Sequence, residues 1–273
     1  MTGESNVVDR GGGEMSAAPK YPGELYVHDD AERLARAAAE LFVGVAKESI
    51  PARGRFRVAL SGGSTPRRVY ELLATEDFSS RIDWEHVEVF WGDERYVAAD
   101  DRDSNYRMTA ETLLLHVPIP PGNVHRIPTE ISPPQDAARA YEEDIRQSFG
   151  GSASLPQFDL IYLGLGTNGH TASLFPHSPA LQEKSRLVFA DFVAEVNTWR
   201  ISMSAPLLNR GRTVAFLIEG GQKAQVLRQV LLGPRDPERL PAQLIHPAGT
   251  LLWLVDESAA ASLSGKMRER RSA

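Results

Sequence analysis

The 273-residue sequence contains no cysteine. Disulfides, thiolate catalysis and cysteine-ligated zinc sites are therefore excluded. The sequence also lacks a surplus of positive charge, because 30 Lys and Arg stand against 36 Asp and Glu, which gives a formal net charge of −6. Nucleic acid is an unfavourable partner for such a chain, since phosphate backbones are usually met by excess Lys and Arg. A small anion remains an acceptable ligand, because cations can cluster locally in an acidic protein.

Long apolar runs are missing as well. The longest, such as residues 251–255, fall far short of the roughly 20 residues that cross a bilayer, so we expect no membrane contact. Residues 1–22 have no apolar core of the kind found in signal peptides or anchors. We predict a disordered tail at 1–22, a single catalytic α/β domain at 23–265 and a C-terminal tail at 266–273, in a cytoplasmic protein.

The remaining composition is that of an ordinary globular protein, with 42% hydrophobic and 24% charged residues. Short β-rich runs alternate with segments of helical period; the runs are residues 25–28, 57–60, 87–91, 160–164, 187–192, 200–204, 213–218 and 251–255. This alternation predicts a Rossmann-like, doubly wound, mainly parallel sheet with helices on both faces. Helix starts are predicted at Asp29 or Asp30, Pro66, Ser104 and Pro133. Ligands of such sheets bind at the carboxyl ends of strands.

The first unusual loop follows the predicted strand at 57–60 and consists of Ser61, Gly62, Gly63, Ser64 and Thr65. Paired glycines let the backbone approach an anion, two hydroxyls add donors, and the next helix begins with free N–H groups. The loop therefore predicts a phosphate site, although a Gly-rich turn that only joins strand to helix is the alternative. It is no Walker loop, because the lysine of that motif is absent.

The second loop follows the predicted strand at 87–91 and carries Asp93, Glu94 and Arg95. Asp93 could orient a hydroxyl or a water, and Arg95 is suited to bidentate capture of a phosphate or carboxylate. The spacing alone favours a plainer interpretation, in which these residues form a solvated charge cluster and Ser104 is only a helix cap.

The third loop runs from Gly164 through Asn168 and Gly169 to His170, directly after a predicted buried strand. A histidine after a run of glycines at a strand end is well placed to reach a ligand, and its pKa near neutrality suits proton transfer. We predict that His170 is a general base, with a structural histidine as the alternative. Among the other six histidines, only His177 is near enough to be a second candidate.

Taken together, these motifs closely resemble the glucosamine-6-phosphate isomerase/6-phosphogluconolactonase family. The resemblance extends over nearly all of residues 24–261 and rests on SGGSTP at Ser61, WGDERYV at Trp91 with DSNY at Asp103, GLGTNGHTASLFP at Gly164, RISMSAPLLN at Arg200, GGQKA at Gly220, and the PAQLI and LLWLVD segments. It implies the fold of the superfamily that includes glucosamine-6-phosphate deaminase and the ribose-5-phosphate isomerases. It also implies hydrolysis of 6-phospho-D-glucono-1,5-lactone to 6-phosphogluconate, in the oxidative branch of the pentose phosphate pathway, without metal or cofactor.

The resemblance also assigns roles to individual residues. It implies that the loop from Ser61 to Thr65, Arg95, Gly169, Arg200 and Lys223 surround the substrate and its phosphate, that His170 activates water, and that Asp93 positions the substrate. Without it, Arg200 would be interpreted as a strand-edge charge and Lys223 as a surface residue at a helix start.

One residue departs from the family pattern, because an acid, usually Asp, commonly precedes the Gly-His pair and here Asn168 stands there. An asparagine can hydrogen-bond the imidazole but cannot stabilise an imidazolium by charge. We nevertheless expect His170 to suffice, with Asn168 in the catalytic set, because the rest of the motif is present.

Two other functions remain open. An amino-sugar phosphate deaminase or isomerase would use a Glu in an FNEP-like stretch, whereas this chain has Ser173-Leu174-Phe175-Pro176 without a carboxylate. A non-catalytic sugar-phosphate sensor is the second alternative, but the segment before Glu24 is too short for the helix-turn-helix that such regulators add. We expect a monomer or a weak homodimer.

Overall fold

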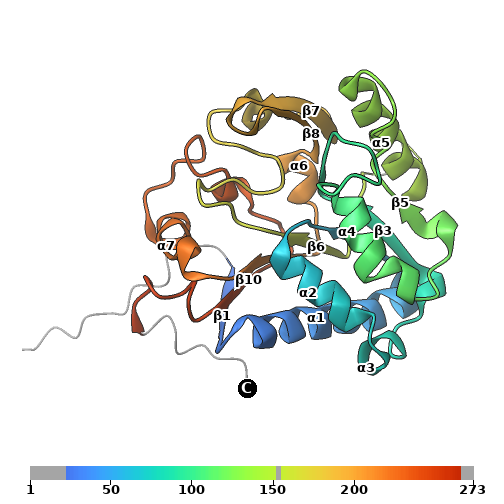
Figure 1. Cartoon of the computed structure of the whole chain (residues 1–273), viewed down its shortest axis with the longest axis horizontal. Helices are drawn as coiled ribbons and strands as arrows, with labels where there is room; N and C mark the ends of the chain where they lie inside the picture. Colours follow the sequence, from blue (N-terminus) through green and yellow to red (C-terminus); the bar gives the residue numbers. More distant parts are fainter. Residues whose placement is uncertain (1–22, 152–154, 266–273) are drawn as a thin grey trace, which may run out of the picture.

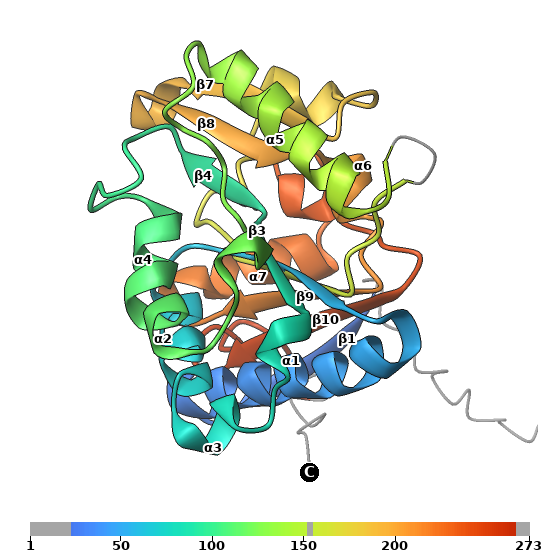
Figure 2. The same cartoon turned by 90° about the vertical axis from the view of Figure 1, so that its right-hand side faces the viewer.

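The computed structural model describes residues 23–151 and 155–265. The tails predicted at 1–22 and 266–273 lie outside the described residues, and the assignment of 23–265 to a single domain stays a prediction. Figures 1 and 2 show a central sheet with α1 and α2 on one side and a smaller sheet with α5 on the other. The helices are α1 (Ala31–Arg53), α2 (Ser64–Leu73), α3 (Glu76–Ser79), α4 (Asn105–Thr112), α5 (Pro134–Ser148), α6 (Ala205–Leu208) and α7 (Ala224–Leu232).

The central sheet has seven strands in the order β1-β10-β9-β6-β2-β3-β5, and every neighbouring pair is parallel. Its strands are β1 (Glu24–His28), β2 (Phe56–Leu60), β3 (Val87–Trp91), β5 (Val124–His125), β6 (Leu160–Leu163), β9 (Thr213–Ile218) and β10 (Thr250–Asp256). The mainly parallel α/β fold is therefore confirmed. From β2 the chain proceeds outward through β3 to β5 and then returns to β6 on the other side of β2. This reversal between β2 and β6 is where doubly wound folds bind ligands.

Burial explains why the strands are almost wholly apolar. Every residue of β3 and β6 is buried, as expected when both faces of a parallel sheet are covered. Helix α1 begins where the Asp30 side chain accepts a hydrogen bond from the N–H of Arg33 at 2.7 Å, and Gly54 ends it in a left-handed conformation. Its buried face includes Ala38 and Phe42, whose different sizes let it pack closely against the sheet.

The strands predicted at 187–192 and 200–204 exist, but their assignment to the parallel sheet is wrong. They are β7 (Val188–Val193) and β8 (Thr198–Met203), which pair antiparallel and, with β4 (Asp93–Arg95), form a separate sheet in the order β4-β8-β7. Only a single 3-10 turn at Ala194–Val196 and the left-handed Asn197 join β7 to β8. So short a connection closes a hairpin, whereas a parallel pair needs a crossover.

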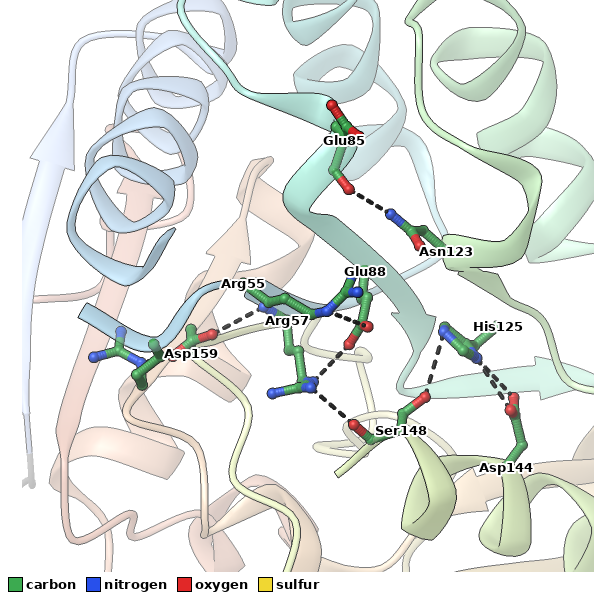
Figure 3. A network of polar contacts seen from close by, with 10 residues as sticks. Arg55, Arg57, Glu85, Glu88, Asn123, His125, Asp144, Ser148 and Asp159 are labelled. Carbon is green, nitrogen blue, oxygen red and sulfur yellow. Dashed lines mark hydrogen bonds and ion pairs between the residues drawn. The ribbon is translucent and has the colours of Figure 1, made fainter. Parts of the chain in front are cut away.

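Charged residues are paired at the amino ends of four neighbouring strands of the central sheet. Figure 3 shows Asp159, Arg57, Arg55 and Glu88 of this set. Buried Asp159 directly precedes β6. Its carboxylate accepts hydrogen bonds from the Nε of Arg53 at 2.8 Å and from the backbone N–H of Arg57 at 2.9 Å. It also lies 3.6 Å from the Nε of Arg212. Buried Glu88 on β3 receives the Nε of Arg57 at 2.6 Å and lies 3.2 Å from the Nε of Arg55. The signs alternate across the strands, so each buried carboxylate is compensated.

Candidate active site

A cavity of about 370 Å³ lies at the opposite, carboxyl ends of the same strands, and this volume is typical of a small-molecule site. Loops that follow β9, β6, β2 and β3 line it together with β8 and the start of α7. Except for Gly169, every residue that the sequence predicted for the site lines this cavity: Ser61, Gly62, Gly63, Ser64, Thr65, Asp93, Arg95, Asn168, His170, Arg200 and Lys223. The polar loops predicted from the sequence therefore lie where the strand order reverses.

The loop after β2 is shaped for close approach of a ligand to its backbone. Buried Tyr70 supports it, because its hydroxyl accepts from the N–H of Ser61 at 3.0 Å and donates to the Ser61 carbonyl at 2.8 Å. A Cβ on Gly62 would lie 1.8 Å from the Oδ1 of Asn105, so no larger residue fits there without movement. Gly63 has φ +110° and gives α2 no side-chain cap. The first-turn N–H groups of α2 can therefore meet an anion.

The loop after β3 differs from the solvated cluster that its spacing favoured. Asp93 is 8% exposed and accepts a hydrogen bond from the Ser173 hydroxyl at 2.7 Å. Glu94 is 3% exposed and accepts from the backbone N–H of Asn105 and Tyr106 at 2.7 and 2.8 Å, so it anchors the start of α4. The expected Ser104 cap is confirmed, since its hydroxyl accepts from the N–H of Arg107 at 3.1 Å. The loop is thus a rigid support with one carboxylate in the cavity.

Three cations meet in this cavity without carboxylate partners. Arg95 on β4 and Arg200 on β8 are cross-strand neighbours, and Lys223 precedes α7. Within residues 23–151 and 155–265, none of the three makes an ion pair with a carboxylate, and the Nε of Arg200 is buried without a hydrogen-bond partner. Burial and the charge of Arg95 lower the pKa of Arg200, and burial lowers the pKa of Lys223. Facing like charges are unfavourable, so this arrangement is suited to an anionic ligand.

The strand-edge interpretation of Arg200 is wrong, because β8 is the central strand of the small sheet. The surface interpretation of Lys223 is also wrong, since this side chain is partly buried and lines the cavity. Neither placement follows from local sequence; only the resemblance indicated them.

The His170 ring is held by the glycines around it. The N–H of Gly166 donates to the His170 carbonyl at 2.8 Å, and a Cβ on Gly166 would lie 2.1 Å from the His170 Nδ1. The ring stacks on Phe175 with centroids 4.2 Å apart. Burial, with smaller contributions from Lys223 and Arg200, lowers the pKa of His170 to about 4, while Asp93 and Glu195 oppose this shift. The imidazole is therefore neutral at pH 7, as a general base must be.

Asn168 determines which nitrogen of that ring carries the proton. Its Oδ1 accepts from the backbone N–H of His170 at 3.1 Å and lies 2.6 Å from the His170 Nδ1. Its Nδ2 donates to the Glu195 carboxylate at 2.9 Å. Because an amide oxygen can only accept, Nδ1 must hold the hydrogen, and the lone pair is on Nε2.

Gly169 and His177 lie outside the cavity lining. The N–H of Gly169 donates to the Gly166 carbonyl at 3.0 Å, its carbonyl accepts from Ala242 at 3.0 Å, and its φ is +89°. Gly169 therefore shapes the turn before His170, and its predicted contact with the substrate stays a prediction.

Sequence reasoning missed several residues that line the cavity, among them Asn105, Ser173, Phe175, Glu195, Glu219 and Gln222. Asn105, Ser173 and Phe175 belong to the DSNY and GHTASLFP motifs and could have been included on that ground. Glu195 belongs to no motif and comes from the β7–β8 turn. Within the described chain, no group of three or more His, Asp or Glu is placed to hold a metal ion, and every helix falls short of the length or apolar character of a membrane span.

Comparison with known proteins agrees with this architecture. The model of the family described as glucosamine-6-phosphate isomerases/6-phosphogluconolactonase matches residues 29–253. A 6-phosphogluconolactonase of Synechocystis sp. is 43% identical over 217 residues, which cover 79% of this chain and 88% of the relative. The solved structure of 6-phosphogluconolactonase from Trypanosoma brucei superimposes with a TM-score of 0.80 at 29% identity, covering 89% of this chain and 100% of that chain.

A monomeric glucosamine-6-phosphate deaminase shares the fold, with a TM-score of 0.75 over 88% of this chain and 99% of that chain, at only 20% identity. This likeness confirms the predicted fold. With a matched family model over most of its length and a curated relative at 43% identity, this chain belongs to the glucosamine-6-phosphate isomerase/6-phosphogluconolactonase family.

Proposed function

We propose that this chain hydrolyses 6-phospho-D-glucono-1,5-lactone to 6-phosphogluconate with a water molecule activated by His170. The lactonase class follows from the names of its relatives. The substrate, the mechanism and a place in the oxidative branch of the pentose phosphate pathway are the proposal. One observation carries it: a neutral imidazole with its lone pair on Nε2 lines the same cavity as Arg200 and Lys223, which lack carboxylate partners within the described residues.

The reaction begins when Nε2 of His170 removes a proton from water. The water oxygen bonds to the lactone carbonyl carbon, and the carbonyl electrons move onto oxygen to form a tetrahedral oxyanion. When the oxyanion collapses, the bond from that carbon to the ring oxygen breaks. The proton on His170 then passes to the ring oxygen, which becomes a hydroxyl. A pKa of about 4 makes the imidazolium a good acid for this second transfer.

The substrate phosphate accounts for the cations and for the bare helix start. A phosphate dianion in this cavity would neutralise Arg200 and Lys223 and receive the first N–H groups of α2. Binding the remote phosphate would hold the lactone carbonyl near His170 and so convert binding energy into orientation. The Asp93 carboxylate, fixed by Ser173, would accept a hydrogen bond from a sugar hydroxyl.

The test is hydrolysis of freshly prepared 6-phosphogluconolactone with a chelator present, corrected for spontaneous ring opening. We expect turnover far above the uncatalysed rate, and much lower kcat/KM for glucono-1,5-lactone without the phosphate. As a control, His177→Asn should hydrolyse the lactone as fast as the wild type, because His177 does not line the cavity. Ammonia release from glucosamine 6-phosphate would replace the proposal with a deaminase. Tight binding of 6-phosphogluconate without lactone hydrolysis would replace it with a sensor.

A further inference from the structure

Glu195 connects the β7–β8 turn to the base through Asn168. The turn places the Glu195 carboxylate 2.9 Å from the Nδ2 of Asn168, whose Oδ1 lies 2.6 Å from the His170 Nδ1. A negative charge thus stands one amide group away from the imidazole. The chain has no acid at 168, but it has a carboxylate bonded to the asparagine at that position.

We propose that Glu195 is a positioning residue that acts through Asn168 to orient His170 and to supply the negative charge that position 168 lacks. This inference rests on the proposed role of His170 as the base. It concerns a residue outside every motif that relates the chain to its family.

Glu195 first fixes the orientation of the Asn168 amide. An asparagine amide has nearly the same shape when it is flipped, so shape alone does not decide whether oxygen or nitrogen faces the imidazole. The Glu195 carboxylate can only accept, so it holds Nδ2 toward itself and leaves Oδ1 for His170. The backbone N–H of His170 supports the same orientation. A flipped amide would favour the tautomer with its proton on Nε2, which cannot take a proton from water.

Glu195 also acts on His170 through its negative charge. Four charged groups act on the imidazole: Asp93 from β4, Arg200 from β8, Lys223 from before α7, and Glu195 from the turn. The two cations oppose protonation of His170, and the two carboxylates favour it, so Glu195 raises the pKa of His170 against the larger effect of burial. Removing the Glu195 charge leaves Asp93 alone against two cations. The base then becomes weaker, and the imidazolium formed during attack becomes less stable.

Position 168 and position 195 are coupled by this geometry. An Asp at 168 would put a second carboxylate next to that of Glu195, and like charges at this distance repel. A single charge at either position is therefore favourable, and charges at both are not. Solvent reaches the exposed Glu195 side chain, so screening keeps the effect well below that of losing the base itself.

The experiment compares Glu195→Gln, Asn168→Asp and the double variant with the wild type in kcat and KM across pH. Glu195→Gln keeps an acceptor for Asn168 but removes the charge, and we expect kcat to fall about tenfold with KM nearly unchanged. The acid limb of its kcat/KM profile moves to lower pH. Asn168→Asp in the Glu195→Gln background restores most of kcat, whereas in the wild-type background it gives a smaller gain or a loss. Glu143→Gln removes the same charge from an exposed side chain of α5, and we expect this control variant to match the wild type.

Two results would overturn the inference: an unchanged kcat and pH profile in Glu195→Gln, or no recovery in the double variant. His170→Gln separates this from the proposed function. If His170→Gln is inactive and Glu195→Gln is normal, only the role of Glu195 is refuted. If His170→Gln keeps its activity, the proposed mechanism is refuted and the role of Glu195 with it.

Discussion

The two ends of the same four strands carry opposite arrangements of charge. At the amino ends of β9, β6, β2 and β3, the carboxylates of Asp159 and Glu88 each have arginine partners at 2.6 to 3.6 Å. At the carboxyl ends, Arg200 and Lys223 share a cavity and make no carboxylate ion pair among residues 23–151 and 155–265. Paired charges at one end stabilise the fold, whereas unpaired charges at the other lower stability until an anion binds. The absence of carboxylate partners distinguishes the end where we propose that the substrate binds.

Among the substitutions that compare the two ends, the largest effect should come from Arg200→Met. We expect kcat/KM for the phosphorylated lactone to fall about a hundredfold to a thousandfold, because a preorganised charged donor is lost. The free energy of unfolding should stay the same or rise, since a partly buried guanidinium, whose Nε has no hydrogen-bond partner, is removed from beside Arg95. Steady-state kinetics and urea denaturation measure the two quantities.

Arg55→Met is the matched control at the amino end, where the side chain is partly exposed beside Glu88. It removes the same charge, and we expect unchanged kinetics and less than about 1 kcal/mol of lost stability. Equal kinetic losses in both variants would mean that net charge, and not the cavity, controls activity.

Asp159→Asn should do the reverse of Arg200→Met: the free energy of unfolding should fall and the kinetics should not change. The effect should be smaller than that of Arg200→Met. The Arg53 side chain and the backbone of Arg57 would lose their charged acceptor, and we expect about 2–3 kcal/mol of lost unfolding free energy. Because Arg53 is 35% exposed, water limits the loss. A urea titration measures this loss of stability. Steady-state kinetics should show unchanged activity per folded molecule. A variant of normal stability and low activity would break the distinction between the two ends.

The smallest effect should appear in the pH dependence. Since burial and two cations lower the pKa of His170 to about 4, the His170 ring of the free enzyme should stay neutral from pH 7 to 5 and be half protonated near pH 4. The folded pKa lies below the unfolded value near 6.5, so the stability linked to His170 is complete above pH 6.5 and is lost as pH falls toward 4. Bound 6-phosphogluconate should raise the pKa, which an NMR titration of the His170 ring would detect. A His170 ring that titrates near pH 6.5 in the free enzyme would contradict the buried, cation-flanked imidazole.

Local signals in the sequence predicted much of the fold. The strand at 87–91 agrees with β3 residue for residue, because β-branched and aromatic residues around the single Glu88 favour a strand without distant information. Asp30 and Ser104 cap α1 and α4 as predicted, since a cap bonds within its own helix. The pairing of β7 with β8, and of β4 with β8, was not predicted. Sheet membership depends on contacts between distant segments, such as Arg95 with Arg200.

The candidate site follows the same rule. The serine-glycine loop, Asp93 and His170 were found because each directly follows a strand, and parallel strands bring their carboxyl ends together. Arg200 and Lys223 were indicated only by family resemblance, since their sequence neighbours say nothing of the cavity. Glu195 lies 27 residues from Asn168 and reaches it through the hairpin turn. No periodicity or motif encodes that contact, so only coordinates could reveal it.

The most direct test of the account is kcat for lactone hydrolysis by His170→Gln beside the wild type, at pH 7 and with spontaneous opening subtracted. Glutamine keeps polar atoms near the ring position but cannot accept a proton from water. We predict a fall of about 10² to 10⁴ in kcat, the range for loss of a positioned general base, with the fold intact by circular dichroism. A His170→Gln enzyme that turns over at the wild-type rate would contradict the central claim.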